Sequence, residues 1–265
     1  MEFVQALGLE IAYQRAGDGP PVVLVHSAAS DGREWTPQID GLADELTVVA
    51  WDEPGAGRSS TLPADFELDD YVRCLAAVIE AVGLGPAHVG GISWGGIVAQ
   101  RLYACRPELV TTLILADTYA GWKGSLPERE LQARIERLRA VLDGPADDLG
   151  GAFPGLFAAG PAPELATLVD EIAADVRPES VRSMLAMADV DLGAELAEIA
   201  VPTLLVWGED DVRSPLRIAR QFEEAIPGAE LAVIPEAGHL SNLERPDAFT
   251  EAVREFCRAH PPHSR

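Results

Sequence analysis

The sequence predicts an α/β fold with a mostly parallel, doubly wound sheet and an inserted helical lid. Short apolar runs that end in turns alternate with helix-compatible segments through residues 22–118 and again from residue 201 onward, the pattern of successive strand–helix units. Runs such as 22–25 are apolar at every position, as in parallel strands covered on both faces. Residues 119–198 interrupt this alternation and contain no convincing strand.

The domain organisation follows from where the alternation stops and resumes. We expect residues 1–118 and 199–265 to form one core domain, and residues 119–198 to form a helical cap (lid) over the carboxyl edge of its sheet. A chain of 265 residues is long enough for one large domain with an insertion, and its 48% of hydrophobic residues allow a sizeable core.

In the first part of the core, residues 3–15 alternate apolar and polar side chains on either side of Gly8, which predicts an antiparallel hairpin. The turn at 17–20 then leads into the parallel strands. We expect strands at 22–25, 47–51, 87–92 and 110–116, and helices from Trp35 to about Leu46, at 68–82 and at 95–104.

The insertion contains helical stretches separated by loops rich in glycine and proline. We expect these helices at 126–142, 164–174 and 178–188. Beyond the insertion, the alternation predicts strands at 201–207 and 229–234 and helices at 215–226 and 246–258.

Composition and charge restrict the partners of this chain. A formal net charge of −23 argues against nucleic acid and anionic membranes. No apolar run reaches the roughly 18 residues of a membrane span, and no secretory signal is visible at the amino terminus. The scattered cysteines indicate free thiols in a reducing compartment: Cys74, Cys105 and Cys257. We expect a cytoplasmic monomer or homodimer that acts on a small molecule.

A candidate nucleophile stands where the strand 87–92 turns into the following helix. The turn reads Gly91-Ile92-Ser93-Trp94-Gly95, and small residues are needed there because a Cβ would clash where the chain crosses itself closely. The free N–H groups at the start of a helix suit a developing oxyanion. The alternative is a simple glycine–serine turn without a chemical role.

A serine hydroxyl needs a base within hydrogen-bonding reach and a third group that orients the base. Loops that follow parallel strands gather at one edge of the sheet, so His26 and His239 are the candidate bases. The turn after strand 201–207 offers three carboxylates, and its place between Ser93 and His239 fits the order serine, acid, histidine. These acids are Glu209, Asp210 and Asp211. The alternatives are a surface histidine and solvated loop acids.

With these residues the sequence resembles the α/β-hydrolase family over nearly the whole chain. Five segments carry the resemblance, in the order of the family: His26-Ser27 after a strand, Asp52-x-Pro-Gly55-x-Gly57-x-Ser59, Gly91-x-Ser93-x-Gly95-Gly96, Gly208-x-x-Asp211, and Gly238-His239-x4-Glu244-x-Pro246. The resemblance implies an α/β-hydrolase fold and a serine hydrolase, similar to bacterial carboxylesterases and enol-lactonases.

The resemblance also implies a role for individual residues. Ser93 corresponds to the nucleophile, His239 to the general base and Asp211 to the orienting acid. Asp210 is the nearest rival for the acid, and Asp117, at the end of the strand before the lid, is a weaker one.

The oxyanion would be held by the backbone N–H groups of Trp94 and Ala28. Here the chain departs from the family, because Ser27 replaces the usual glycine after the histidine. His26 is then expected to be a structural residue of this loop, since a triad needs only one base.

The predicted reaction is the hydrolysis of a carboxylic ester or lactone through an acyl-enzyme on Ser93, without a metal or an organic cofactor. A serine at this position does not support the epoxide-opening and dehalogenating chemistry of relatives that use a carboxylate nucleophile. Candidate residues of a mainly apolar pocket are Ser27, Trp35, Trp94, Trp122, Phe153, Leu156, Phe157, Met184, Met187 and Leu240.

Other readings of the same residues remain open. No basic cluster for a substrate carboxylate is visible, although single cations are available in Lys123, Arg182 and Arg213. A proline iminopeptidase would need acids that hold an amine, and the lid offers Glu128, Glu164 and Glu171. Carbon–carbon bond hydrolases, cofactor-free perhydrolases and receptors that bind a small molecule without turnover share the same triad.

Overall fold

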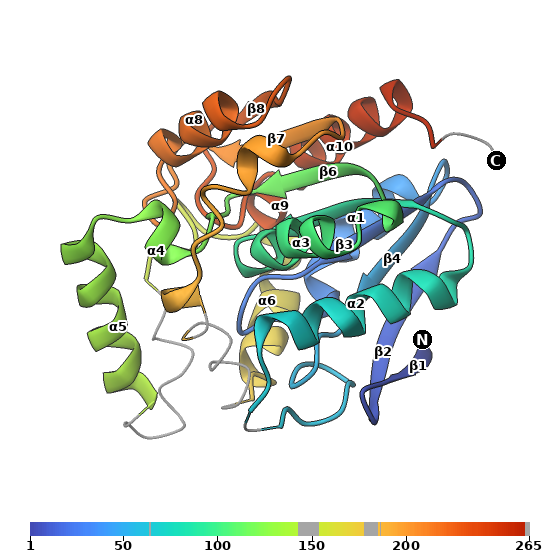
Figure 1. Cartoon of the computed structure of the whole chain (residues 1–265), viewed down its shortest axis with the longest axis horizontal. Helices are drawn as coiled ribbons and strands as arrows, with labels where there is room; N and C mark the ends of the chain where they lie inside the picture. Colours follow the sequence, from blue (N-terminus) through green and yellow to red (C-terminus); the bar gives the residue numbers. More distant parts are fainter. Residues whose placement is uncertain (64, 143–153, 178–184, 186, 263–265) are drawn as a thin grey trace.

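The structure is a computed structural model, and it describes all residues except 64, 143–153, 178–184, 186 and 263–265. The described residues form one eight-stranded sheet with the strand order β1-β2-β4-β3-β5-β6-β7-β8 (Figure 1). The pairs β1–β2 and β2–β4 are antiparallel, and all other neighbouring pairs are parallel. The strands are β1 (Glu2–Ala6), β2 (Leu9–Ala16), β3 (Pro21–Val25), β4 (Thr47–Trp51), β5 (Ala87–Ile92), β6 (Val110–Ala116), β7 (Thr203–Gly208) and β8 (Glu230–Ile234). This is the mostly parallel, doubly wound sheet that the sequence predicts.

Alternate residues of the central strands face two separate hydrophobic cores. In β3, Val23 and Val25 belong to a core that includes residues of α2, α3 and α8, whereas Val22 and Leu24 belong to a second core that includes residues of α1 and α10. Burial on both faces explains why these strands are apolar throughout. The covering helices are α1 (Thr36–Leu42), α2 (Leu68–Val82), α3 (Trp94–Cys105), α8 (Leu216–Ala225) and α10 (Pro246–Ala259).

The strand order places the functional loops beside each other. The chain enters the parallel sheet at β3, adds β4 on one side and then continues with β5 on the other. Val25, at the end of β3, is paired with Gly91, near the end of β5. The loop after β3 therefore lies next to Ser93, at the switch point where ligands bind in open α/β sheets.

Between β6 and β7 the described residues contain helices and turns and no strand. The helix α5 stands away from the sheet at the left of Figure 1, and α6 lies closer to the centre. The described elements of this segment are α4 (Trp122–Ser125), α5 (Glu128–Leu142), η4 (Pro163–Leu165), α6 (Ala166–Ala174) and η5 (Leu196–Glu198). The expected helix at 178–188 lies largely outside the described residues. The division into core and lid at 118/119 and 198/199 stays a prediction.

Three helical details differ from expectation, and the first is the short helix α4, which precedes the expected helix at 126–142. The helix α1 ends at Leu42 rather than near Leu46, because the chain must turn so that the Thr47 N–H donates to the Pro20 carbonyl oxygen as β4 begins. A short helix, α9 (Ser241–Glu244), follows His239 and was not expected. In the part of the chain that the structure describes, no helix combines the length and the apolar character needed to cross a bilayer.

Candidate active site

Ser93 lies at the sharp turn between β5 and α3 with φ +53° and ψ −116°, an unusual backbone conformation for a residue other than glycine. A Cβ on Gly91 would overlap the backbone oxygen of Gly95, and one on Gly95 would overlap the carbonyl oxygen of Val25. Both glycines are therefore required by the close approach of backbone to backbone. The strained turn places the Ser93 hydroxyl at the carboxyl end of the sheet, where it lines a pocket.

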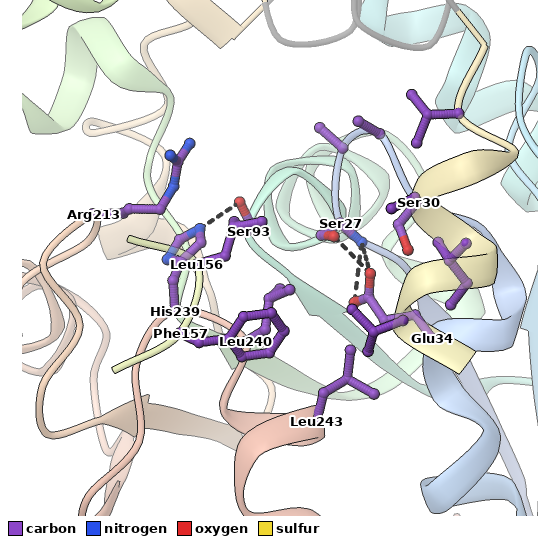
Figure 2. A pocket seen from close by; sticks show the side chains of 16 residues that line it. Ser27, Ser30, Glu34, Ser93, Leu156, Phe157, Arg213, His239, Leu240 and Leu243 are labelled. Carbon is purple, nitrogen blue, oxygen red and sulfur yellow. Dashed lines mark hydrogen bonds between the residues drawn. The ribbon is translucent and has the colours of Figure 1, made fainter. Parts of the chain in front are cut away.

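A continuous hydrogen-bond path runs from Ser93 through His239 to Asp211. The distance from His239 Nε2 to Ser93 Oγ is 2.9 Å (Figure 2), and from His239 Nδ1 to Asp211 Oδ2 it is 2.8 Å. The other oxygen of Asp211 accepts the backbone N–H groups of Arg213 and Ser214 at 2.7 and 2.9 Å. These donors fix the orientation of the carboxylate. Because Asp211 Oδ2 accepts from Nδ1, Nδ1 carries the proton and Nε2 is free to accept the one on Ser93.

Burial lowers the pKa of His239 below its usual value, and the charges of Arg213 and Arg134 act in the same direction. Asp211 opposes this shift through its charge and its hydrogen bond. The imidazole is consequently neutral near pH 7, the form in which it can take a proton.

The two rival carboxylates lie elsewhere. Asp117 is buried and accepts the Gly208 N–H at 2.8 Å and the Ser241 hydroxyl at 2.5 Å. Burial, followed by the charge of Asp211, raises the pKa of Asp117 well above its usual value. Asp210 is exposed to solvent. Of the three acids, Asp211 is the one whose carboxylate is hydrogen-bonded to His239.

His26 is fully buried behind the loop that follows β3. Its Nδ1 lies 2.8 Å from the Ser27 carbonyl oxygen, and its Nε2 accepts the Glu53 backbone N–H at 3.1 Å. Because one partner can only accept and the other can only donate, Nδ1 carries the proton. Both ring nitrogens hold the backbone, which is the structural placement expected for His26.

Ser27 is held by a buried carboxylate that the sequence did not single out. Its hydroxyl donates to Glu34 Oε2 at 2.6 Å, and its backbone N–H lies 3.3 Å from both oxygens (Figure 2). Burial raises the pKa of Glu34, and hydrogen bonds from Ser27 and Ser30 oppose the rise. The serine at this position is thus matched by an acid seven residues later. An acid in a short turn carries no sequence signal of burial.

Trp94 is anchored by a second buried acid. Its indole N–H donates to Glu53 Oε2 at 2.7 Å, and its ring packs edge-on against Tyr71 at 5.4 Å. Glu53 is 0% exposed, and burial raises its pKa to about 7. The Glu53 side chain thereby holds the first residue of α3, whose backbone N–H follows Ser93.

A pocket of about 730 Å³, including its open mouth, lies in front of Ser93 and His239 (Figure 2). Most of its wall is apolar and comes from α6, from the segment 156–157 and from the region of α9. The pocket is lined by Ser27, Ala28, Ala29, Ser30, Glu34, Ser93, Leu156, Phe157, Val169, Ile172, Ala173, Val176, Arg213, His239, Leu240 and Leu243. Of the expected lining residues, these include Ser27, Leu156, Phe157 and Leu240.

Four other expected lining residues were placed wrongly. Trp35, Trp94, Trp122 and Met187 are at most 3% exposed and belong to the hydrophobic cores rather than to the pocket wall. Large apolar side chains that follow a helical or strand pattern usually fill the core, and composition does not reveal which cavity they face. Phe153 and Met184 lie outside the described residues.

The structure also shows which of the charged residues considered for substrate binding lie in the pocket. Arg213 lines the pocket, Lys123 is exposed elsewhere, and Arg182 lies outside the described residues. The lid acids considered for an amine are all exposed and line no part of this pocket: Glu128, Glu164 and Glu171. Within the described ranges, no group of three His, Cys, Asp or Glu side chains is arranged to ligate a metal ion.

Glu244 connects the loop of His239 to the segment before α6. Its buried carboxylate accepts the backbone N–H of Gly238 at 2.7 Å and those of Ala158, Ala159 and Gly160 at 3.1, 2.6 and 3.2 Å. The sequence marked Glu244 as part of a family motif without giving it a role. Its four donors show that it joins two walls of the pocket.

Comparison with known proteins gives relatives along the whole chain. A protein of Azorhizobium caulinodans, provisionally named carbamate hydrolase RutD, is 31% identical over 265 residues, covering 97% of this chain and 98% of that protein. A thermophilic esterase from Thermogutta terrifontis matches with a TM-score of 0.85 at 29% identity, over 98% of this chain and 100% of that one. The enol-lactonase from Burkholderia xenovorans LB400 matches with a TM-score of 0.79 at 25% identity, over 97% and 100%.

The sequence also matches the family described as the alpha/beta hydrolase fold over residues 20–246. This match covers most of the chain and includes all five segments on which the resemblance was based. The fold, the relatives and the family match agree, and the chain is a hydrolase that belongs to the α/β hydrolase fold family.

Proposed function

We propose that this hydrolase cleaves a carboxylic ester or lactone of a small to medium, mainly apolar substrate through an acyl-enzyme on Ser93. The observation that carries the proposal is the path from Ser93 Oγ to His239 and on to Asp211, at 2.9 and 2.8 Å, in the wall of an apolar pocket. This is the arrangement that activates a hydroxyl for attack on a carbonyl carbon. The names of the esterase and enol-lactonase relatives support the same substrate class.

In the proposed mechanism Ser93 Oγ bonds to the carbonyl carbon while its proton passes to His239 Nε2. The backbone N–H groups of Trp94 and Ala28 donate to the oxyanion. When the tetrahedral intermediate collapses, the bond to the leaving alkoxide breaks and His239 returns the proton to it. Water then attacks the acyl-enzyme with His239 as base, which releases the acid and restores Ser93. In a lactone the alkoxide stays tethered to the acyl group, and the product is a hydroxy acid.

The test is a panel of 4-nitrophenyl esters and simple lactones with the unaltered protein and with Ser93→Ala. Loss of the nucleophile is expected to lower kcat on the order of 10⁵-fold or more. Cys105→Ser, at an exposed position outside the pocket, is the control and is expected to keep full activity. A fluorophosphonate label is expected on Ser93 alone and is expected to be absent in His239→Ala.

The same experiments separate the rival readings. A receptor would show ligand-dependent thermal stabilisation without Ser93-dependent turnover, and a peptidase would prefer aminoacyl anilides over esters. Ester or lactone hydrolysis that persists in Ser93→Ala, or a label that maps to another residue, would overturn the proposal.

A further inference from the structure

Arg213 places a positive charge in the wall of the pocket. It follows Asp211 by two residues, and its backbone N–H donates to that carboxylate at 2.7 Å. The side chain lines the pocket together with Ser93 and His239. In Figure 2 it lies on the same side of the pocket as these two residues, whereas Glu34 lies on the opposite side. The geometry of the turn therefore holds a cation close to the reacting groups.

This cation has no anionic partner among the described residues. Its Nη1 donates to the Pro154 carbonyl oxygen at 3.1 Å. Its Nε is buried without an acceptor in the described part of the chain, and no hydrogen bond from Nη2 to a described residue is formed. Burial lowers the pKa of Arg213, and the charges of Arg134 and Arg137 add to this effect.

Tyr119 and Asp211 favour the charge of Arg213. The Tyr119 hydroxyl accepts a hydrogen bond from Arg134, and both oxygens of Asp211 accept hydrogen bonds from other groups. The chain has 43 acidic and 20 basic residues, so the absence of an anionic partner for Arg213 among the described residues does not reflect a shortage of acids. Many other arginines pair with carboxylates, including Arg33, Arg101, Arg106, Arg217, Arg254 and Arg258. A guanidinium stays charged at all ordinary pH values, and a partly buried charge without a partner destabilises the fold.

The free edge of the guanidinium has a defined chemistry. Nε and Nη2 point two N–H groups in parallel, the arrangement that binds both oxygens of a carboxylate. Because Nε is shielded from solvent, a rotation of the terminal dihedral angles is needed to present this edge to the pocket. The other polar side chains of the pocket wall already form hydrogen bonds: Ser93 with His239, and Ser27 and Ser30 with Glu34.

We infer that Arg213 binds a carboxylate of the substrate, so that the substrate is an ester or lactone that carries a free carboxylate as well as the scissile bond. This inference rests on the proposed function and narrows its substrate class. Glu34 lies on the opposite wall and is itself an acid, which favours one orientation of the substrate, with the anion beside Arg213 and the apolar part toward Leu240 and Leu243.

The test uses pairs of esters that differ in charge alone. One pair has the carboxylate in the acyl part: mono-4-nitrophenyl glutarate and the corresponding terminal amide. The other has it in the alcohol part: the acetate esters of 4-hydroxybenzoate and of 4-hydroxybenzamide. In at least one pair the unaltered protein is expected to prefer the anionic ester in kcat/KM by about 10- to 100-fold, the usual effect of a hydrogen bond to a charged group.

Arg213→Gln is expected to bring the ratio of kcat/KM for the anionic ester to that for its neutral partner close to one, and Arg213→Lys is expected to retain part of the preference. Arg217→Gln is the matched control, because this exposed arginine pairs with Glu130 outside the pocket. Thermal melting of each variant verifies folding. Competitive inhibition by glutarate, but not by glutaramide, gives a second readout in the unaltered protein.

Equal kcat/KM for the charged and neutral members of both pairs in the unaltered protein would overturn the inference, as would a preference that survives in Arg213→Gln. Either result leaves the proposed function intact as long as the neutral esters are hydrolysed in a Ser93-dependent manner. If neither member of either pair, nor any ester or lactone of the broader panel, is hydrolysed through Ser93, the proposed function itself fails.

Discussion

Ser27 and Glu34 interact directly beside the proposed oxyanion site. The serine stands where the family usually has glycine, and its hydroxyl and N–H both donate to the buried carboxylate. Ala28, the next residue, is the proposed second oxyanion donor. A change at Glu34 should therefore act on catalysis through the position of the Ala28 N–H, although Glu34 does not react itself.

Ser27→Gly is expected to destabilise the protein by about 1–3 kcal/mol, because Glu34 stays buried and loses a hydroxyl donor. Glu34→Gln is expected to be destabilising as well, since the uncharged amide accepts weaker hydrogen bonds. Urea unfolding of the two single variants and the double variant gives their coupling energy, which is expected to exceed about 0.5 kcal/mol. Additive effects would contradict a direct Ser27–Glu34 interaction. Both single variants should lower kcat more than they raise KM.

The raised pKa of Glu53 leads us to expect that the stability of the protein depends on pH. Burial raises the pKa of Glu53 to about 7 from its usual value of 4.5. Between these values the unfolded chain loses the proton and the folded chain keeps it, so the contribution of Glu53 to stability falls as pH rises from about 4.5 to about 7 and is lost above that range. A shift of this size corresponds to a few kcal/mol at most.

Glu53→Gln keeps an acceptor for the Trp94 indole but cannot ionise. The unfolding free energy of this variant, relative to the unaltered protein, is therefore expected to rise between pH 5 and pH 8, as measured by urea unfolding at each pH. His26 and Glu34 lie close enough to influence the titration, so the comparison is made between the two proteins at the same pH. A constant difference across the range would show that Glu53 does not titrate there.

At the scale of elements, the sequence predicts the parallel strands well because each is apolar along its whole length. The turn around Ser93 is predicted because it needs small residues at Gly91 and Gly95. The short helix α9 was missed, since four residues carry no helical period. Burial of Glu34 and Glu53 was missed as well, because an acid looks the same in sequence whether it is solvated or enclosed.

The pocket was predicted least well, for a related physical reason. Hydrophobicity indicates that a side chain is removed from water, but it does not say whether the side chain faces a core or a cavity. Trp35 and Trp122 therefore looked like wall residues and are core residues. Arg213 was one cation among three possibilities, and its place in the wall follows from the turn after β7 rather than from any pattern.

Gly90 and Gly91 are neighbours in β5, but we expect their substitution by alanine to have different effects on stability. A Cβ on Gly91 would overlap backbone atoms of Gly95 and Gly96, whereas one on Gly90 would meet the flexible Leu24 side chain, with Cδ2 at 2.9 Å. Gly91→Ala is expected to cost about 3 kcal/mol or more, and Gly90→Ala about 1–2 kcal/mol. Thermal and urea unfolding measure both. Equal effects at the two positions would contradict the close crossing of β5 and α3.

At the scale of the whole molecule, the pocket joins parts of the chain that are far apart in sequence. One wall follows β8 and carries His239, and another is the segment from Leu156 to Ala162. The two are connected along their length, since the Leu240 N–H donates to the Leu156 carbonyl oxygen and the Ala162 N–H to that of Leu243, each at 2.9 Å. The Glu244 carboxylate accepts three further hydrogen bonds from the segment 156–162 and one from Gly238 in its own loop.

Glu244→Gln tests whether this connection shapes the pocket. The amide keeps one acceptor oxygen but directs an NH₂ group at N–H donors, so at least one of the backbone groups loses its partner, at a cost of about 1–3 kcal/mol. The segment 156–162 is expected to open more often, and hydrogen exchange of peptides from it should accelerate more than exchange in β5 or β6. KM for an apolar ester should rise several-fold, because Leu156 and Phe157 line the pocket.

The effect on kcat distinguishes a change in the pocket from a change in the reacting groups. His239 keeps its hydrogen bonds to Asp211 and Ser93 in the variant, so kcat is expected to fall less than KM rises. Glu236→Gln is the matched control, because Glu236 lies in the same loop but is exposed and pairs with Arg245 at the surface. If Glu244→Gln lowered kcat strongly and left KM and exchange of 156–162 unchanged, Glu244 would act on His239 alone. The segment before α6 would then be held by its other contacts.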